Sequence, residues 1–112
     1  MVSLKLDDSD VFLELKGKAD FILGRLDEPS KSFPDIDLDP HGGQEAGVSR
    51  RHARLVLVGN GLSYIIDLSS TNGTFVNDEP CEPLTHYRLK DGDRLDLGEL
   101  GLVYVESPDA DE

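Results

Sequence analysis

Cysteine and tryptophan are almost missing from this sequence of 112 residues, which contains one cysteine, Cys81, and no tryptophan. A single cysteine excludes an internal disulfide framework and a metal site built from several cysteines, so a reducing cytoplasm is the simplest compartment. We expect Cys81 to lie in a loop and to have no special role.

Long apolar segments are missing as well. No apolar stretch reaches the roughly twenty residues that a membrane-spanning helix needs. The N-terminus has no basic flank followed by an apolar region, so we expect neither a signal peptide nor a membrane anchor.

Basic residues are scarce: 11 Lys and Arg face 23 Asp and Glu, and the net charge is −12. Such a surface repels nucleic acid and anionic membranes, so we expect neither as a partner, and it favours a monomer, alone or within a longer protein. It does not exclude a local phosphate site, because salt screens exposed charges beyond roughly 8 Å.

Segments suited to a long helix are also missing, because 11 Gly and 6 Pro interrupt the chain. Apolar residues come in short blocks between turn residues, a pattern typical of strands. The predicted strands are 11–15, 21–23, 35–39, 53–58, 62–67, 75–76, 87–89, 94–97 and 100–105. A turn at 16–18 is expected to join the first two as a hairpin. The sequence predicts one all-β domain of about ten strands, which fits a β-sandwich better than a barrel.

Acidic residues gather at both ends of the chain and indicate the domain boundaries. We expect residues 1–10 to be a loose N-terminal lead-in, although Leu4 and Leu6 alternate and are able to pair at an edge. Residues 11–105 form the predicted domain, and residues 106–112 form an acidic C-terminal tail.

The chemically distinctive stretch is a cationic turn that contains Ser49, Arg50 and Arg51. A hydroxyl, main-chain N–H groups and two guanidiniums suit a doubly charged oxyanion, since charge-assisted hydrogen bonds to phosphate are strong. Gly24 ends an earlier strand and places Arg25 at the rim of the sheet. The alternative is that these arginines are ordinary solvated surface charges.

The acidic alternation at 35–39 resembles part of a calcium loop. An EF-hand loop that starts at Asp35 needs Gly at its sixth position and Glu at its twelfth. This chain has Pro40 and Ala46 at those positions, so calcium is not expected.

A small hydrolase that uses Ser49 and His52 is another alternative, because Ser-x-x-His brings a hydroxyl near an imidazole. A nucleophile also needs an orienting third group and an oxyanion site. The sequence has no Gly-x-Ser-x-Gly elbow, so we expect no enzyme activity and no catalytic residue.

Together, several motifs resemble the forkhead-associated (FHA) domain. In chain order they are Gly24-Arg25, the alternating segment 35–39, Ser49-x-x-His52, Thr71-Asn72-Gly73-Thr74-Phe75-Val76-Asn77 and Leu89-x-Asp91-Gly92-Asp93-x-Leu95-x-Leu97-Gly98. The resemblance spans roughly residues 11–105. It implies a β-sandwich of about eleven mostly antiparallel strands whose loops at one end bind a phosphothreonine peptide in Ser/Thr-kinase signalling.

The resemblance also implies roles for individual residues. Arg25 and Ser49 contact the phosphate, Arg50 adds main-chain or side-chain contacts, Thr71 is a further ligand on the phosphate side, and Asn72 binds the peptide backbone. The supporting residues are Gly24, His52 and Gly73. No metal or cofactor is implied, and the partner is a phosphothreonine-containing protein. A phosphate-independent interaction scaffold on the same fold is the alternative function.

Overall fold

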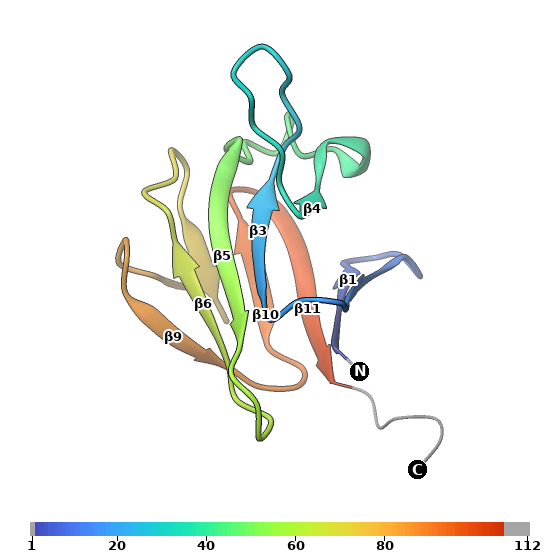
Figure 1. Ribbon diagram of the computed structural model, residues 1–112, viewed down its shortest axis with the longest axis vertical. Helices are drawn as coiled ribbons and strands as arrows, with labels where there is room; N and C mark the ends of the chain where they lie inside the picture. Colours follow the sequence, from blue (N-terminus) through green and yellow to red (C-terminus); the bar gives the residue numbers. More distant parts are fainter. Residues whose placement is uncertain (1, 107–112) are drawn as a thin grey trace.

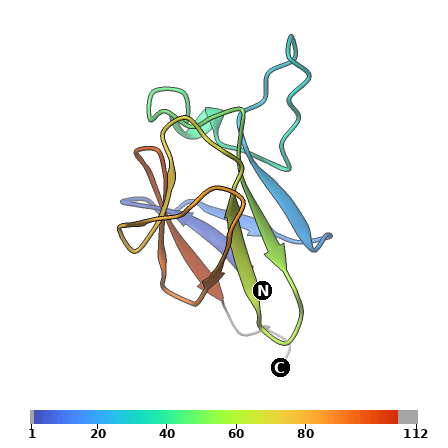
Figure 2. The same cartoon turned by 90° about the vertical axis from the view of Figure 1, so that its left-hand side faces the viewer.

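Two β-sheets pack face to face in the computed structural model, which describes residues 2–106 (Figures 1 and 2). The 6-stranded sheet has the order β2-β1-β11-β10-β7-β8 and the 5-stranded sheet the order β4-β3-β5-β6-β9. The strands of the first sheet are β1 (Val2–Leu6), β2 (Phe12–Leu15), β7 (Thr74–Val76), β8 (Glu79–Pro80), β10 (Arg94–Leu97) and β11 (Leu100–Glu106). Those of the second are β3 (Asp20–Gly24), β4 (Ile36–Asp37), β5 (Arg51–Leu57), β6 (Ser63–Asp67) and β9 (His86–Leu89). The predicted β-sandwich is confirmed.

The core lies between the sheets because alternate residues of each inner strand point inward. Leu4, Leu95 and Leu102 of the first sheet and Leu55 and Ile65 of the second are fully buried. Burial of a side chain of this size contributes about 1.5–3 kcal/mol. The apolar blocks of the sequence therefore supply the packing of the sandwich.

The expected loose lead-in at residues 1–10 is wrong for residues 2–6, which form β1. This strand lies between β2 and β11, and Leu4 pairs with Tyr104. Leu4 is fully buried. Its apolar alternation is too short to distinguish an inner strand from an edge strand, because its principal partner lies about a hundred residues away in sequence.

The expected hairpin between the first two predicted strands is also wrong. β2 pairs with β1, whereas β3 pairs with β5 and β4 in the other sheet. The segment 16–19 thus crosses between the sheets. The glycine turn signalled a change of direction without indicating which strand would be the partner.

Several local expectations also need correction. The strand predicted at 35–39 is shorter, because only Ile36–Asp37 pairs, parallel to β3, and Asp39–His41 forms a 3₁₀ turn. β8 lies between 76 and 87, where the sequence predicts no strand. Cys81 follows β8 and lies outside any strand, as expected for a loop residue, but it is 8% exposed and packs into the core.

Three connections meet at one end of the sandwich, at the top of Figure 1: β3–β4, β4–β5 and β6–β7. They carry the residues of the candidate site. At the other boundary, Glu106 ends β11, and the rest of the predicted acidic tail lies outside the described residues. Among residues 2–106, no helix is long and apolar enough to cross a membrane.

Candidate functional site

Gly24 allows the β3–β4 and β4–β5 connections to touch. The Arg25 backbone N–H donates to the Arg50 carbonyl oxygen at 3.0 Å, beside a register shift at Leu23 and Gly24. A Cβ atom at position 24 would lie 1.9 Å from that oxygen. Because such an approach is open only to glycine, Gly24 has a geometric role.

The Arg25 side chain is anchored next to Ser49. Arg25 Nε donates to the Val48 carbonyl oxygen at 2.6 Å, and the side chain is half-buried. This bond uses one of the five N–H donors of a guanidinium. The group is held in place at the rim and keeps donors for an anion.

His52 is fully buried beneath the β4–β5 and β6–β7 connections. The Ser49 backbone N–H donates to His52 Nδ1 at 2.9 Å, and His52 Nε2 lies 2.9 Å from the Gly73 carbonyl oxygen. Since Nδ1 accepts, the neutral ring carries its proton on Nε2 and donates it to Gly73. Gly73 has a φ of 89°, a conformation that glycine adopts without strain. His52 thereby ties the β4–β5 and β6–β7 connections together.

This arrangement predicts an acid-sensitive fold. Burial is the main cause that lowers the pKa of His52 below its ordinary value of 6.5. The unfolded chain therefore binds a proton at a higher pH than the folded chain does, and the free energy of unfolding decreases as pH falls below about 6.5. One proton gives a slope of at most about 1.4 kcal/mol per pH unit. Urea unfolding at pH 7.5, 6.5 and 5.5 measures this slope.

A His52→Gln variant should lose that slope, and a His86→Gln variant should keep it, because His86 is exposed on β9. The pKa of the buried Asp67 lies below its ordinary value of 3.8, so this carboxylate does not contribute to the slope in this pH range. An unchanged slope in His52→Gln would assign the acid sensitivity to another group.

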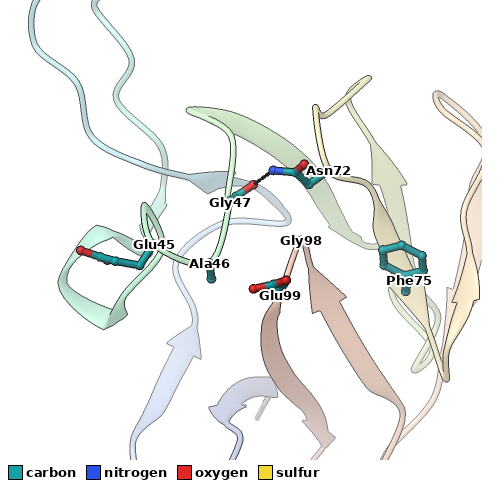
Figure 3. Close-up of a pocket in the computed structure, with 7 residues that line it drawn as sticks. All are labelled: Glu45, Ala46, Gly47, Asn72, Phe75, Gly98 and Glu99. Carbon is teal, nitrogen blue, oxygen red and sulfur yellow. Dashed lines mark hydrogen bonds between the residues drawn. The ribbon is translucent and has the colours of Figure 1, made fainter.

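Ser49 also contacts the β6–β7 connection through its hydroxyl. The Thr71 backbone N–H donates to Ser49 Oγ at 3.1 Å. Asn72 Nδ2 donates to the Gly47 carbonyl oxygen at 2.9 Å, the bond drawn in Figure 3. Because Ser49 Oγ accepts from Thr71, its own proton remains to be donated to an anion. Arg25, Ser49, Thr71 and Asn72 thus meet at one rim.

The same contacts count against a Ser49–His52 hydrolase. A nucleophilic serine needs an imidazole nitrogen that accepts its hydroxyl proton. His52 Nδ1 accepts from the Ser49 backbone instead, and Nε2 faces the Gly73 carbonyl oxygen. Both ring nitrogens are therefore engaged with the main chain.

The side chain of Arg50 lies elsewhere. Arg50 Nη1 donates to Asp27 Oδ2 in the β3–β4 connection at 3.3 Å. Arg54, another basic residue of this stretch, donates to the carboxylate of Asp20, with its Nε 2.8 Å from Asp20 Oδ1. The structure brings the backbone of Arg50 to Arg25 but directs its guanidinium toward Asp27.

A buried carboxylate that sequence reasoning missed holds the β6–β7 connection. Asp67 is 2% exposed and accepts from Ser70 Oγ at 2.6 Å and from Thr74 Oγ1 at 2.7 Å. Burial acts to raise the pKa of Asp67, but these hydrogen bonds outweigh it and hold the pKa below its ordinary value. Ser70 Oγ in turn accepts from the Gly73 N–H at 3.0 Å. Asp and Ser spaced three residues apart at a strand end are typical of such turns, and this spacing is the sequence pattern that could have indicated the role of Asp67.

The acidic segment at 35–39 has structural contacts of its own. Asp35 accepts from Lys18 and from the Ile22 backbone, and Asp37 accepts from the Leu26 backbone N–H at 3.0 Å. Across residues 2–106, no group of three or more His, Cys, Asp or Glu residues is placed to hold a metal ion. These aspartates fasten the β3–β4 connection to the sheet.

A hollow of about 420 Å³ opens beside Asn72 (Figure 3). Its lining residues are Glu45, Ala46, Gly47, Asn72, Phe75, Gly98 and Glu99. Three connections contribute to it, β4–β5, β6–β7 and β10–β11, and Phe75 of β7 completes the lining.

Comparison with known sequences identifies the family. The FHA domain family model matches residues 21–98. Glycogen accumulation regulator GarA of Mycolicibacterium smegmatis is 37% identical over 90 residues, which are 78% of this chain and 52% of that protein. Protein FraH of Nostoc sp. is 43% identical over 70 residues, which are 62% of this chain and 24% of FraH. The chain thus spans about half of GarA and a quarter of FraH.

Solved structures agree. One, from a structural and functional analysis of phosphothreonine-dependent FHA domain interactions, has a TM-score of 0.74, 32% identity and coverage of 96% of this chain and 97% of that chain. The FhaA FHA domain, complexed with the intracellular domain of Rv3910, has a TM-score of 0.71, 32% identity and coverage of 93% and 99%. The matched motifs, the sandwich and the family model lead to one conclusion: this chain belongs to the FHA domain family.

Proposed function

We propose that this chain is a phosphothreonine-peptide-binding module in Ser/Thr-kinase signalling, which recognises a phosphorylated partner protein through its rim loops. The observation that carries the proposal is the meeting of Arg25 and Ser49. Arg25 Nε is fixed by the Val48 carbonyl at 2.6 Å, and Ser49 Oγ is fixed by the Thr71 N–H at 3.1 Å. A guanidinium and a hydroxyl that main-chain groups hold at the same rim suit a phosphate dianion.

Each rim residue has a role in this proposal. Arg25 and Ser49 bind phosphate oxygens, and Thr71 adds a donor from the β6–β7 connection. Asn72 binds the peptide backbone beside the phosphothreonine. Arg50 contributes main-chain or side-chain contacts, and the latter require its guanidinium to leave Asp27, a half-exposed pair that is worth little.

Threonine is the expected phosphorylated residue. A pocket for its extra methyl group contributes on the order of 0.8 kcal/mol. Its β-branched side chain is also stiffer, so less conformational freedom is lost on binding. Together these effects are expected to favour phosphothreonine over phosphoserine by roughly tenfold.

Relatives support a non-catalytic, regulatory role. Their names include a glycogen accumulation regulator, GarA, and an oxoglutarate dehydrogenase inhibitor of Corynebacterium diphtheriae that is 36% identical over 94 residues. The FhaA FHA domain was solved with the intracellular domain of another protein. For this chain we infer a phosphorylated protein partner and no cofactor, and the cytoplasmic location remains a prediction from its single cysteine.

A titration with degenerate phosphothreonine, phosphoserine and unphosphorylated peptide pools, followed by two-dimensional NMR, tests the proposal. We expect shifts at Arg25, Ser49, Arg50, Thr71 and Asn72 with the phosphothreonine pool. The absence of shifts with every pool would overturn the proposal and favour a phosphate-independent scaffold on the same fold.

A further inference from the structure

A second concave surface adjoins the proposed phosphate site at Arg50, and we call it the cationic hollow. It has a volume of about 370 Å³ and is lined by Ser30, Lys31, Ser32, Arg50 and Arg51. Its lining holds three of the 11 Lys and Arg residues of a chain whose net charge is −12. No acidic side chain lines it.

Two of these three charges have no acidic partner in the part of the chain that the structure describes. Asp27 pairs with Arg50 at 3.3 Å. Within residues 2–106, neither Lys31 nor Arg51 has an acidic side chain within the 4.0 Å of a salt bridge. Cations that gather at one place repel one another, and an anion between them relieves that repulsion.

The hollow is held in shape by a closed turn. The backbone N–H groups of Asp27 and Ser32 donate to each other's carbonyl oxygens at 3.0 and 2.9 Å. Lys31 adopts a φ of 59°, which is uncommon for a residue other than glycine, and its N–H donates to the Glu28 carbonyl at 3.0 Å. A fixed backbone around Lys31 reduces the ordering that binding requires.

One carbonyl group joins the hollow to the phosphate site. The Arg50 carbonyl oxygen accepts from the Arg25 N–H at 3.0 Å and from Ser32 Oγ at 3.1 Å. An extended peptide advances about 3.3 Å per residue. A side chain a few residues from a phosphothreonine bound at Arg25 therefore reaches the hollow.

We propose that the cationic hollow is a second anion-binding subsite, which takes a carboxylate or a second phosphate carried by the same peptide close to the phosphothreonine. The proposal rests on the proposed function, since the phosphothreonine places the peptide. Lys31 and Arg51 supply the charges that have no acidic partner among residues 2–106.

A peptide scan at low salt tests this subsite. The parent peptide carries one phosphothreonine in an alanine-rich background, and single alanines within four residues on either side are replaced by glutamate or by phosphoserine. We expect a second anion at one or two positions to tighten binding about fivefold to tenfold. Isothermal titration calorimetry measures the dissociation constants.

Two variants locate the effect. Lys31→Asn keeps a residue that tolerates positive φ, and Arg51→Gln changes an exposed strand residue. Each is expected to reduce the gain to below about twofold while the parent peptide binds as to the unmodified domain. Arg88→Gln on β9 changes the net charge equally and should preserve the gain.

The outcomes separate the two proposals. Failure of the parent peptide to bind would overturn the proposed function and the subsite with it. Binding of the parent without a gain at any position would overturn the subsite alone. A gain equal at all positions, and reduced equally by Arg88→Gln, would assign the effect to overall charge and also overturn the subsite.

Discussion

Replacement of Arg25 by alanine is expected to weaken phosphothreonine-peptide binding at least tenfold while the fold remains intact. The Arg25 guanidinium is fixed on the Val48 carbonyl at 2.6 Å, next to Ser49. Each charge-assisted hydrogen bond to phosphate is worth about 1.5–3 kcal/mol, which corresponds to about tenfold to a hundredfold in affinity. Calorimetric titration with one phosphothreonine peptide measures the loss.

The matched control is Arg88→Ala, which removes the same charge from β9 and should bind as the unmodified domain does. Circular dichroism and a thermal melt establish that both variants are folded. Equal affinity of a folded Arg25→Ala variant and the unmodified domain would remove Arg25 from the site. An equal loss in Arg88→Ala would show that total charge, rather than Arg25, governs binding.

Replacement of Gly24 by alanine is expected to destabilise the whole sandwich by about 3 kcal/mol. The new Cβ would meet the Arg50 carbonyl oxygen at 1.9 Å, and this oxygen belongs to the backbone, so no flexible side chain can yield. Either the Arg25–Arg50 hydrogen bond breaks or β3 separates from β5. A thermal melt should show that the melting temperature of Gly24→Ala is lower than that of the unmodified domain by roughly 10 °C or more.

Gly92→Ala is the control for this second substitution. Gly92 has a φ of 90°, and a Cβ atom there would meet nothing within 4 Å. Its cost is therefore backbone strain alone, about 1 kcal/mol. A Gly24→Ala variant no less stable than Gly92→Ala would contradict the close approach. Peptide binding should also weaken in Gly24→Ala, because Arg25 follows directly.

The strands were predictable because their signals are local. The apolar blocks at 53–58, 62–67 and 94–97 correspond to β5, β6 and β10, and the turn at 59–61 joins β5 to β6 as an antiparallel pair. Short periodic segments flanked by glycine carry this information within a few residues.

The candidate site was predictable in part. The order of Gly24, Arg25, Ser49 and the 71–74 segment along the chain predicts the site, and hydrogen bonds bring these residues to one rim in the structure. The support from Asp67 and the pairing of Arg50 with Asp27 were not predicted. In the sequence, Asp67 cannot be distinguished from other polar residues at strand ends, because its hydrogen bond from Thr74 forms only in the fold. Asp27 becomes the partner of Arg50 only because β3 and β5 are neighbours in one sheet.

The sequence by itself determined that this protein is an all-β domain and where its turn residues lie, and it supplied the side chains that we propose to bind a phosphate. Those properties depend on residue type and on neighbours along the chain. Only the tertiary structure decided that β1 lies inside a sheet and that β2 and β3 belong to different sheets. It also decided that His52 is buried and, as a neutral ring, donates a hydrogen bond to the Gly73 carbonyl oxygen. The physical reason is that strand register and burial depend on partners far apart in sequence, for which a short segment carries no signal.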